Sequence, residues 1–278
     1  MDEALAVIEC SGVSHTGPVR EDNQDAIRLP DSHRSQERGW LYAVADGMGG
    51  YAHGRMASTL ALEKLFDVFY RDRARSAPRA LKDGVQSANL GVYRAAQRLG
   101  AGRMGTTLTA AGVIGNKLYL AHVGDSRAYL IRDHQSVCLT QDHTAVGELV
   151  RLKVLPPEKV RTHAQRSILT KGVGLQLFIQ PDISEHTLKE GDRVVLCSDG
   201  VWSVIEDDEF AKVAAQTHRA RELSESLIEL ALERSTDDNA SAITLHVTDL
   251  SPSPARNRAS HKIWHLIPDW LSRRVAGI

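Results

Sequence analysis

The stretch TTLTAAGVIGNKLYLAHVGDSRAYLIR, residues 106–132, decides the fold class of this chain. β-Branched, aromatic and other apolar residues fill three short runs within it, at 106–114, 117–123 and 127–132. This composition is typical of β-strands. The links between the runs are short and made of turn-forming residues. Strands that follow one another through such links are expected to pair as antiparallel hairpins.

Further strands are predicted on both sides of this stretch, at 40–46, 192–199 and 241–247. Apolar residues at helical spacing predict three helices between the strands. Their apolar faces are Leu62, Leu65, Phe66 and Phe69; then Leu81, Val85, Ala88, Val92, Ala96 and Leu99, before the helix-stop residue Gly100; then Leu223, Leu227, Leu230 and Ala231. We interpret these faces as core packing. Antiparallel strands interrupted by helices predict an α+β layered domain rather than a parallel doubly wound sheet.

The composition argues against several classes of protein. The formal net charge is -1 in 278 residues, whereas general nucleic-acid or membrane-surface binders carry an excess of cations. Three scattered cysteines predict reduced thiols. The beginning MDEALAVIEC lacks the features of a secretion signal, and no apolar run is long enough to span a bilayer. We therefore expect a soluble, cytoplasmic protein.

Four aspartates lie where predicted strands end, namely Asp46, Asp125, Asp199 and Asp238. Each could simply form a turn, because Asp-Gly and Asp-Asn are common turn sequences. For Asp125, with a strand on either side, the hairpin and ligand interpretations stay equally open. For Asp46 and Asp199 the hairpin is less favoured, because a helical pattern follows each. Glycines after Asp46 would also let the backbone approach a ligand closely.

Aspartates that converge in space would need compensating positive charge. Clustered carboxylates raise one another's pKa and are costly to bury unpaired. Mg²⁺ and Mn²⁺ prefer carboxylate, carbonyl and water oxygens as ligands. The chain has no compact set of histidines and cysteines at zinc spacing. A magnesium or manganese site is therefore expected.

Seven motifs follow one another within residues 12–247: GPVREDNQDA, VADGMGGYAHG, GTTLTAAGV, LAHVGDSRAYLIR, LTQDHTAV, LCSDGVW and TDDNASAI. In this order they resemble the metal-dependent Ser/Thr protein phosphatases of the PP2C (PPM) family, especially its compact bacterial members. A single Asp-Gly pair carries no such information. The resemblance implies an α+β fold, a PP2C-like sandwich of two antiparallel β-sheets flanked by pairs of helices, with metals at one edge.

The resemblance also implies the metal ligands. Asp46 would bridge two Mn²⁺ or Mg²⁺ ions, and the backbone carbonyl of Gly47 would bind the first ion. Asp199 and Asp238 would bind the second ion. Asp125 would bind a weaker third ion, shared with Asp199.

The stretch VREDNQDAI, residues 19–27, would supply the residues around the substrate. Arg20 resembles the phosphate-binding arginine of the family, because its planar guanidinium can hold two phosphoryl oxygens. Asp25 resembles the residue that orients a metal-bound water. Asp22 and Asn23 are interpreted as turn-forming residues.

Two positions depart from the pattern of many relatives. Met48 stands where many eukaryotic members have a histidine proposed as general acid, and Gln24 stands where many members have glutamate. Both variants resemble the bacterial branch. Because methionine cannot donate a proton, the donor to the leaving group stays open between a metal-bound water and an unassigned side chain.

The activity implied is hydrolysis of phosphoserine and phosphothreonine in proteins by a water that two metals activate, without a phosphoenzyme. Cysteine phosphatases need Cys-x₅-Arg, but Thr16, Thr144 and Ser203 occupy the arginine position after the three cysteines. Aspartyl-phosphate enzymes need Asp-x-Asp-Gly, which is absent before Gly47 and Gly200. The alternative is a phosphatase-like binding module without catalysis. It would be expected to lose a metal aspartate or the arginine.

The phosphatase domain is predicted to span residues 1–249, with a flap-like region at about 142–168 that gates substrate access. Residues 250–260 are predicted to be a Ser/Pro/Arg linker, and residues 261–278 an amphipathic segment. For that segment, docking on its own domain is favoured over partner binding, and membrane contact is least favoured. The expected partners are phosphorylated proteins, as substrates of a bacterial Ser/Thr kinase, and no nucleic acid. A monomer is expected.

Overall fold

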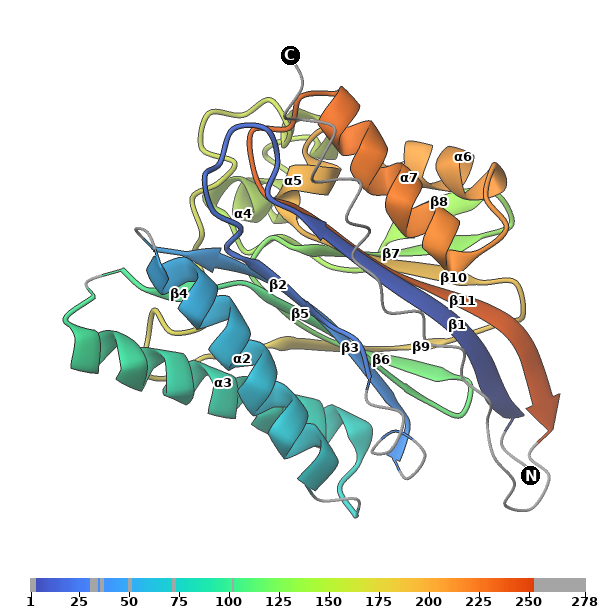
Figure 1. Cartoon of the computed structure of the whole chain (residues 1–278), viewed down its shortest axis with the longest axis horizontal. Coiled ribbons are helices and arrows are strands. Elements are labelled where there is room, and N and C mark those ends of the chain that lie inside the picture. The colour runs from blue at the N-terminus through green and yellow to red at the C-terminus, as the bar shows by residue number, and fades with distance from the viewer. Residues whose placement is uncertain are drawn as a thin grey trace.

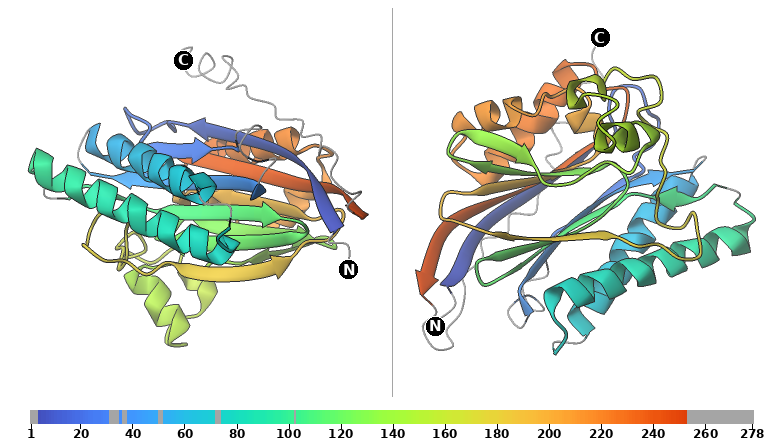
Figure 2. Two further views of the ribbon diagram at one scale, coloured as in Figure 1. Left: turned by 90° about the horizontal axis from the view of Figure 1, so that it is seen from below. Right: turned by 180° about the vertical axis from the view of Figure 1, so that it is seen from behind.

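The computed structural model describes residues 4–30, 35, 38–49, 52–71, 74–101 and 103–252. Two antiparallel sheets pack face to face, and helices cover the outer face of each sheet (Figure 1). The two further views of Figure 2 show the same layers from below and from behind. The predicted α+β sandwich is confirmed.

The first sheet joins the two ends of the described chain. Its strands in spatial order are β1 (Ala4–His15), β11 (Ala240–Pro252), β10 (Arg193–Cys197), β7 (Arg127–Arg132) and β8 (Gln135–Cys138). Its outer face is covered by α5 (Asp199–Trp202), α6 (Glu209–Ala215) and α7 (Ala220–Glu233).

The second sheet carries the long helical pair. Its strands in spatial order are β2 (Asp25–Arg28), β3 (Trp40–Met48), β5 (Leu108–Ile114), β6 (Lys117–Val123) and β9 (Asp182–Thr187). The short β4 (Gly105–Thr106) pairs with the end of β3. The helices α2 (Ala52–Arg71) and α3 (Ala77–Leu99) cover the outer face.

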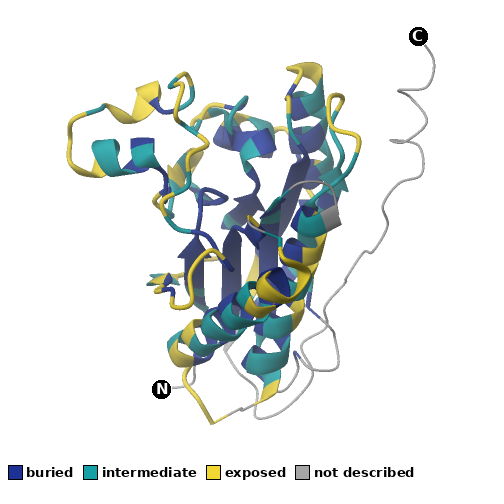
Figure 3. Cartoon of the chain, turned by 90° about the vertical axis from the view of Figure 1, so that its left-hand side faces the viewer, coloured by how far each residue is buried: buried dark blue, intermediate teal, exposed yellow. Residues whose placement is uncertain are grey.

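Strand β3 shows why these elements form. Leu41 and Ala43 pack toward α2 and α3, whereas Tyr42 and Val44 pack between the two sheets, and all four are fully buried. A strand that is covered on both faces needs apolar side chains at every position, so the run WLYAVA does not alternate. Figure 3 shows the buried strands at the centre with the more exposed helices around them.

One predicted hairpin is confirmed and the other is wrong. Strands β5 and β6 pair around the Gly115-Asn116 turn. Strand β6, however, pairs onward with β9, and β7 pairs with β10 in the other sheet. The link from Gly124 to Ser126 therefore crosses between the sheets. Gly124 has a φ of +106°, and the Ser126 hydroxyl lies 2.7 Å from that of Thr107, which holds the crossing in place.

Smaller differences concern the ends of elements. The predicted strand 106–114 is broken at Thr107, whose N–H donates to the backbone carbonyl of Asp46 at 2.8 Å. Strand β11 continues past the predicted domain end at 249 to Pro252, because β1 pairs with it there. Leu99, expected in the core, is 51% exposed at the end of α3.

The flap region contains α4 (Ala145–Arg151) and the 3-10 turn η1 (Pro157–Lys159). Most of the predicted linker and all of the 261–278 segment lie outside the described residues. In the described part of the chain, no helix combines the length and the apolar character that crossing a membrane requires.

Candidate active site

The pairing of β2 with β3 places two of the predicted residues together. Asp25 and Asp46 are directly opposite in the register of the two strands. Side chains at opposite positions of neighbouring strands lie on the same face, about 4.5–5.5 Å apart at Cβ. Asp25 is buried. The register therefore sets one carboxylate beside the other at the edge of the second sheet.

The first sheet brings Asp199 and Asp238 to the same place. Asp199 begins α5 directly after β10, and Asp238 precedes β11, which pairs with β10. Between the sheets, the Ser198 hydroxyl donates to Oδ2 of Asp25 at 2.7 Å. The ends of strands from both sheets thus meet around a group of aspartates.

Burial and mutual repulsion raise the pKa values of these carboxyl groups. Burial, with the charges of Asp199 and Asp238 adding to it, raises the pKa of Asp25 from its ordinary value of 3.8 to about 8. Burial, with the charge of Asp238 adding to it, raises the pKa of Asp199 to about 7. The pKa of Asp46 is raised well above its ordinary value by burial and then by its aspartate neighbours, with Asp25 first.

The oxygen atoms of this group suit a hard divalent cation. Asp25 Oδ1 and Asp199 Oδ1 are buried and have no hydrogen-bond partner. An unpaired buried carboxylate oxygen is costly, and Mg²⁺ or Mn²⁺ would satisfy it. Both oxygens of Asp238 are engaged, one by the Arg20 guanidinium and one by the Asn239 N–H. Over the described residues, no group of three or more histidine, cysteine or acidic side chains is arranged to hold a metal ion.

Asp125 lies on the crossing between the sheets, beside the same group. It is buried, and its pKa is raised by burial and by the charges of Asp199 and Asp142. The Trp202 indole N–H donates to its backbone carbonyl at 2.8 Å. Sequence reasoning missed this contact, which fixes the backbone of the crossing.

Gly47 is a glycine because of packing. A Cβ atom there would lie 2.1 Å from the carbonyl oxygen of Gly54 and 2.7 Å from that of Gln24. Gly54, in the first turn of α2, is also confined, since its Cβ would lie 2.0 Å from Oε1 of the Gln24 side chain and 2.9 Å from the Gly47 carbonyl oxygen. The start of α2 is therefore pressed against the backbone that follows Asp46.

Arg20 lies at the open side of the group. Its Nη2 donates to Asp238 Oδ2 at 2.7 Å and its Nε to the Asp237 carbonyl at 3.2 Å. The side chain is 54% exposed, so the rest of its guanidinium is accessible to a ligand. The arginine is thus attached to one of the predicted metal ligands and open to solvent.

The loop that carries Arg20 is held by Asn239, a residue that sequence reasoning did not single out. Asn239 is buried, accepts from the Gln24 N–H at 2.8 Å, and donates to the carbonyls of Thr16 and Asp22 at 2.7 and 3.0 Å. The motif TDDNASAI contained it, but only the fold shows which loop it holds. Asn23 accepts from the Asp25 N–H at 3.1 Å, which confirms its role in the turn.

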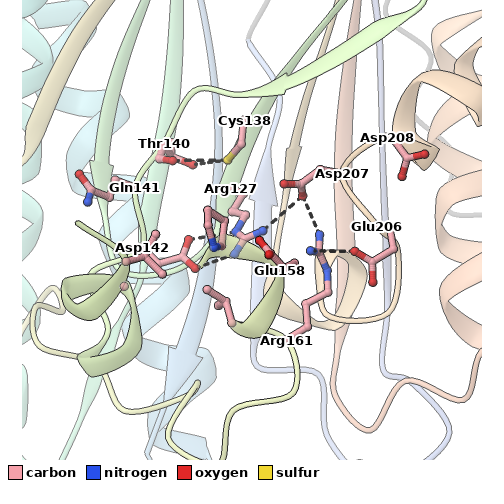
Figure 4. A pocket seen from close by; sticks show the side chains of 14 residues that line it. Arg127, Cys138, Thr140, Gln141, Asp142, Glu158, Arg161, Glu206, Asp207 and Asp208 are labelled. Atoms are coloured by element: carbon pink, nitrogen blue, oxygen red, sulfur yellow. Dashed lines mark hydrogen bonds and ion pairs between the residues drawn. The ribbon is translucent and has the colours of Figure 1, made fainter. Parts of the chain in front are cut away.

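A cavity of about 440 Å³ lies beneath the flap (Figure 4). None of the predicted site residues lines it. Arg127 binds both oxygens of Asp142 at 3.0 and 2.7 Å, and Arg161 of the flap binds Asp207 at 2.6 Å. The guanidinium of Arg127 also stacks on Trp202, 3.6 Å from the ring centroid. These ion pairs attach the flap region to the first sheet.

Comparison with known proteins now identifies the family. The family model for protein phosphatase 2C matches residues 12–233. The chain belongs to the protein phosphatase 2C family. It is 31% identical over 237 residues to the protein phosphatase PhpP of Streptococcus pneumoniae, a match that covers 84% of this chain and 94% of PhpP.

Solved structures of this family show the same fold. The serine/threonine phosphatase Stp1 of Staphylococcus aureus superposes with a TM-score of 0.80 at 29% identity, over 88% of this chain and 97% of Stp1. The catalytic domain of the serine/threonine protein phosphatase PstP, in complex with two manganese ions, superposes with a TM-score of 0.76 at 31% identity. That match covers 87% of this chain and 99% of the PstP domain.

Proposed function

We propose that this chain is a metal-dependent phosphatase that hydrolyses phosphoserine and phosphothreonine in proteins, with two Mn²⁺ or Mg²⁺ ions as cofactors. The observation that carries the proposal is the group of buried and half-buried aspartates beside an accessible arginine, in which Asp25 and Asp199 each have a buried oxygen without a hydrogen-bond partner. Family membership and the two manganese ions of the PstP domain support it.

The proposed roles are those that the family resemblance implies. Asp46, the Gly47 carbonyl, Asp199 and Asp238 would hold the two ions. Asp125, on the crossing between the sheets, would hold a weaker third ion together with Asp199. When bound, the ions supply Lewis acidity that lowers the pKa of water and neutralises charge on the phosphoryl group.

The remaining chemistry belongs to the chain's own residues. Arg20 binds two phosphoryl oxygens with the part of its guanidinium that faces solvent, while Asp238 and the Asp237 carbonyl fix its orientation. Asp25 accepts from Ser198 through one oxygen, so its other oxygen is available to orient the attacking water. Met48 cannot protonate the leaving group, and no side chain is assigned to that step.

Replacement of single aspartates tests the proposal. Asp46→Asn and Asp238→Asn each keep the size of the side chain but remove a charged ligand. Both should abolish Mn²⁺-dependent hydrolysis of p-nitrophenyl phosphate and of a phosphothreonine peptide. Asp208→Asn is the matched control, because Asp208 is exposed and its ion-pair partner among the described residues is Lys212. Near-normal rates in Asp46→Asn or Asp238→Asn would refute the site.

The alternative to the enzyme is a phosphatase-like binding module without catalysis. It predicts that the folded wild-type chain hydrolyses neither substrate at any Mn²⁺ concentration. The retained aspartates and Arg20 favour the enzyme.

The cellular setting is inferred from the same family. We infer that the chain acts in the cytoplasm as a monomer and opposes a Ser/Thr kinase. The domain predicted for residues 1–249, which β11 extends to Pro252, carries the activity. The flap region at about 142–168 gates substrate access, and residues 261–278 dock on the domain or recruit a partner.

A further inference from the structure

The segment between the flap and β9 exposes large apolar side chains. It reads GVGLQLFI over residues 172–179 and runs alongside α3, yellow in Figure 1. Phe178 is 79% exposed, Leu177 48% and Leu175 37%. Single exposed apolar residues are common. Three within four positions of one segment form an exposed apolar patch, and such patches are typical of binding sites.

The backbone of this segment is fixed by α3. Asn89 is fully buried, and its amide donates to the carbonyls of Gln176 and Leu177 at 2.9 and 3.1 Å. Its Oδ1 accepts from the Gly174 N–H at 2.8 Å. Gln86 of the same helix donates to the Ile179 carbonyl. The segment therefore presents Leu177 and Phe178 outward from an anchored backbone.

One end of the segment lies beside the strands that carry the proposed metal site. Strand β4 pairs with β3 so that Gly105 lies opposite Met48, two positions after Asp46. Leu175 packs over Gly105: a Cβ atom at Gly105 would lie 2.7 Å from Cδ2 of Leu175. A Cβ atom at Gly172 would lie 3.5 Å from Cε of Met48. Met48 and Leu175 thus lie at the end of the segment nearest the proposed metal-bridging aspartate, and Leu177 and Phe178 follow along it beside α3. We call these four residues the apolar strip.

We propose that this apolar strip binds the substrate protein, and that preferred substrates carry a large apolar side chain within a few residues of the phosphoserine or phosphothreonine. The proposal rests on the proposed function. A phosphoresidue held at Arg20 and the aspartates would place its neighbours over the edge of β3. An extended peptide advances about 3.3 Å per residue, so a few residues suffice to reach along the strip.

Phosphothreonine peptides that differ at one flanking position provide the test. One series carries leucine or phenylalanine at each position from four before to four after the phosphothreonine, and the matched series carries serine there. With the full-length wild-type protein and Mn²⁺, the best apolar peptide should exceed its serine counterpart about 10-fold in kcat/KM, mainly through KM.

The variant Leu177→Ser/Phe178→Ser should lose most of this preference and keep the wild-type kcat and KM for p-nitrophenyl phosphate. Both side chains are exposed, so the variant should fold. Val137→Ser is the matched control, because Val137 is 56% exposed on β8 of the other sheet. It should discriminate as the wild type does.

The outcomes separate this inference from the proposed function. If the wild type hydrolyses neither p-nitrophenyl phosphate nor any peptide, the proposed function fails. If it hydrolyses them all but shows no apolar preference, or if Leu177→Ser/Phe178→Ser keeps that preference, the apolar strip is not a substrate site. Trp264 and Trp270 are large apolar residues of the 261–278 segment. A preference that emerges only after Trp264→Ser/Trp270→Ser would mean that this segment occupies the apolar strip. A dimer that dissociates only in Leu177→Ser/Phe178→Ser would mean that a second copy does.

Discussion

Single residues set the pH behaviour of this protein. Asp25 is buried between Asp46 and Ser198, and its pKa is raised from 3.8 to about 8. In the unfolded chain the same carboxyl ionises near its ordinary pKa. From about pH 4 to about pH 8, the folded state therefore holds a proton that the unfolded state has released. The free energy of unfolding should fall over this range as the pH rises.

The measurement is the thermal midpoint of the protein in a chelator, at several pH values between about 5 and about 8.5. The free energy of unfolding should fall by up to about 1.4 kcal/mol per pH unit for each carboxyl held protonated. Saturating Mn²⁺ should remove most of this fall, and Asp25→Asn should make it shallower. A midpoint that stays level or rises with pH in the chelator would contradict the raised pKa values.

At the scale of elements, the contact of α2 with β3 holds the proposed site together. Gly54 of α2 has no room for a side chain, since its Cβ would meet Gln24 and the Gly47 carbonyl oxygen at 2.0 and 2.9 Å. Gly54→Ala should therefore push α2 or the Gln24 loop away. We expect a loss of about 1–3 kcal/mol in the free energy of unfolding and weaker Mn²⁺ binding.

A second helical glycine supplies the control. At Gly91 of α3 a Cβ would lie 3.3 Å from Cγ of Lys64, a flexible side chain that can move. Gly91→Ala should stabilise the protein by up to about 1 kcal/mol through helix propensity. Urea unfolding measures the free energy of unfolding of Gly54→Ala, Gly91→Ala and the wild type. Equal stability of Gly54→Ala and the wild type would show that the contact is looser than the structure has it.

Local sequence patterns are sufficient to predict some strands of this fold but not others. Strands β3, β6 and β7 were predictable because their apolar side chains reflect burial. Strand β1 was not, because Glu9, Ser11 and Ser14 interrupt its pattern, and it is fixed by pairing with β11 far along the chain. The residues Gly124 to Ser126 looked like a hairpin turn, yet no local signal says whether the next strand stays in the same sheet. Long-range pairing decides this point.

At the scale of the whole molecule, the two sheets serve to bring distant carboxylates together. The sequence shows aspartates at the ends of strands, and the family resemblance implies their roles as metal ligands. Only the fold shows that Asp25 lies opposite Asp46, and that Ser198 and Asn239 connect the two sheets. The hydrogen bonds of Ser198 and Asn239 join residues 173 and 215 positions apart, so local sequence patterns do not reveal them.

Calorimetric titration of the full-length protein with Mn²⁺ near neutral pH tests the central claim most directly. The wild type and Asp208→Asn should bind at least two ions per chain, and Asp46→Asn should lose this binding while it remains folded. Absence of binding by the wild type, or unchanged stoichiometry and affinity in Asp46→Asn, would contradict the proposed metal centre.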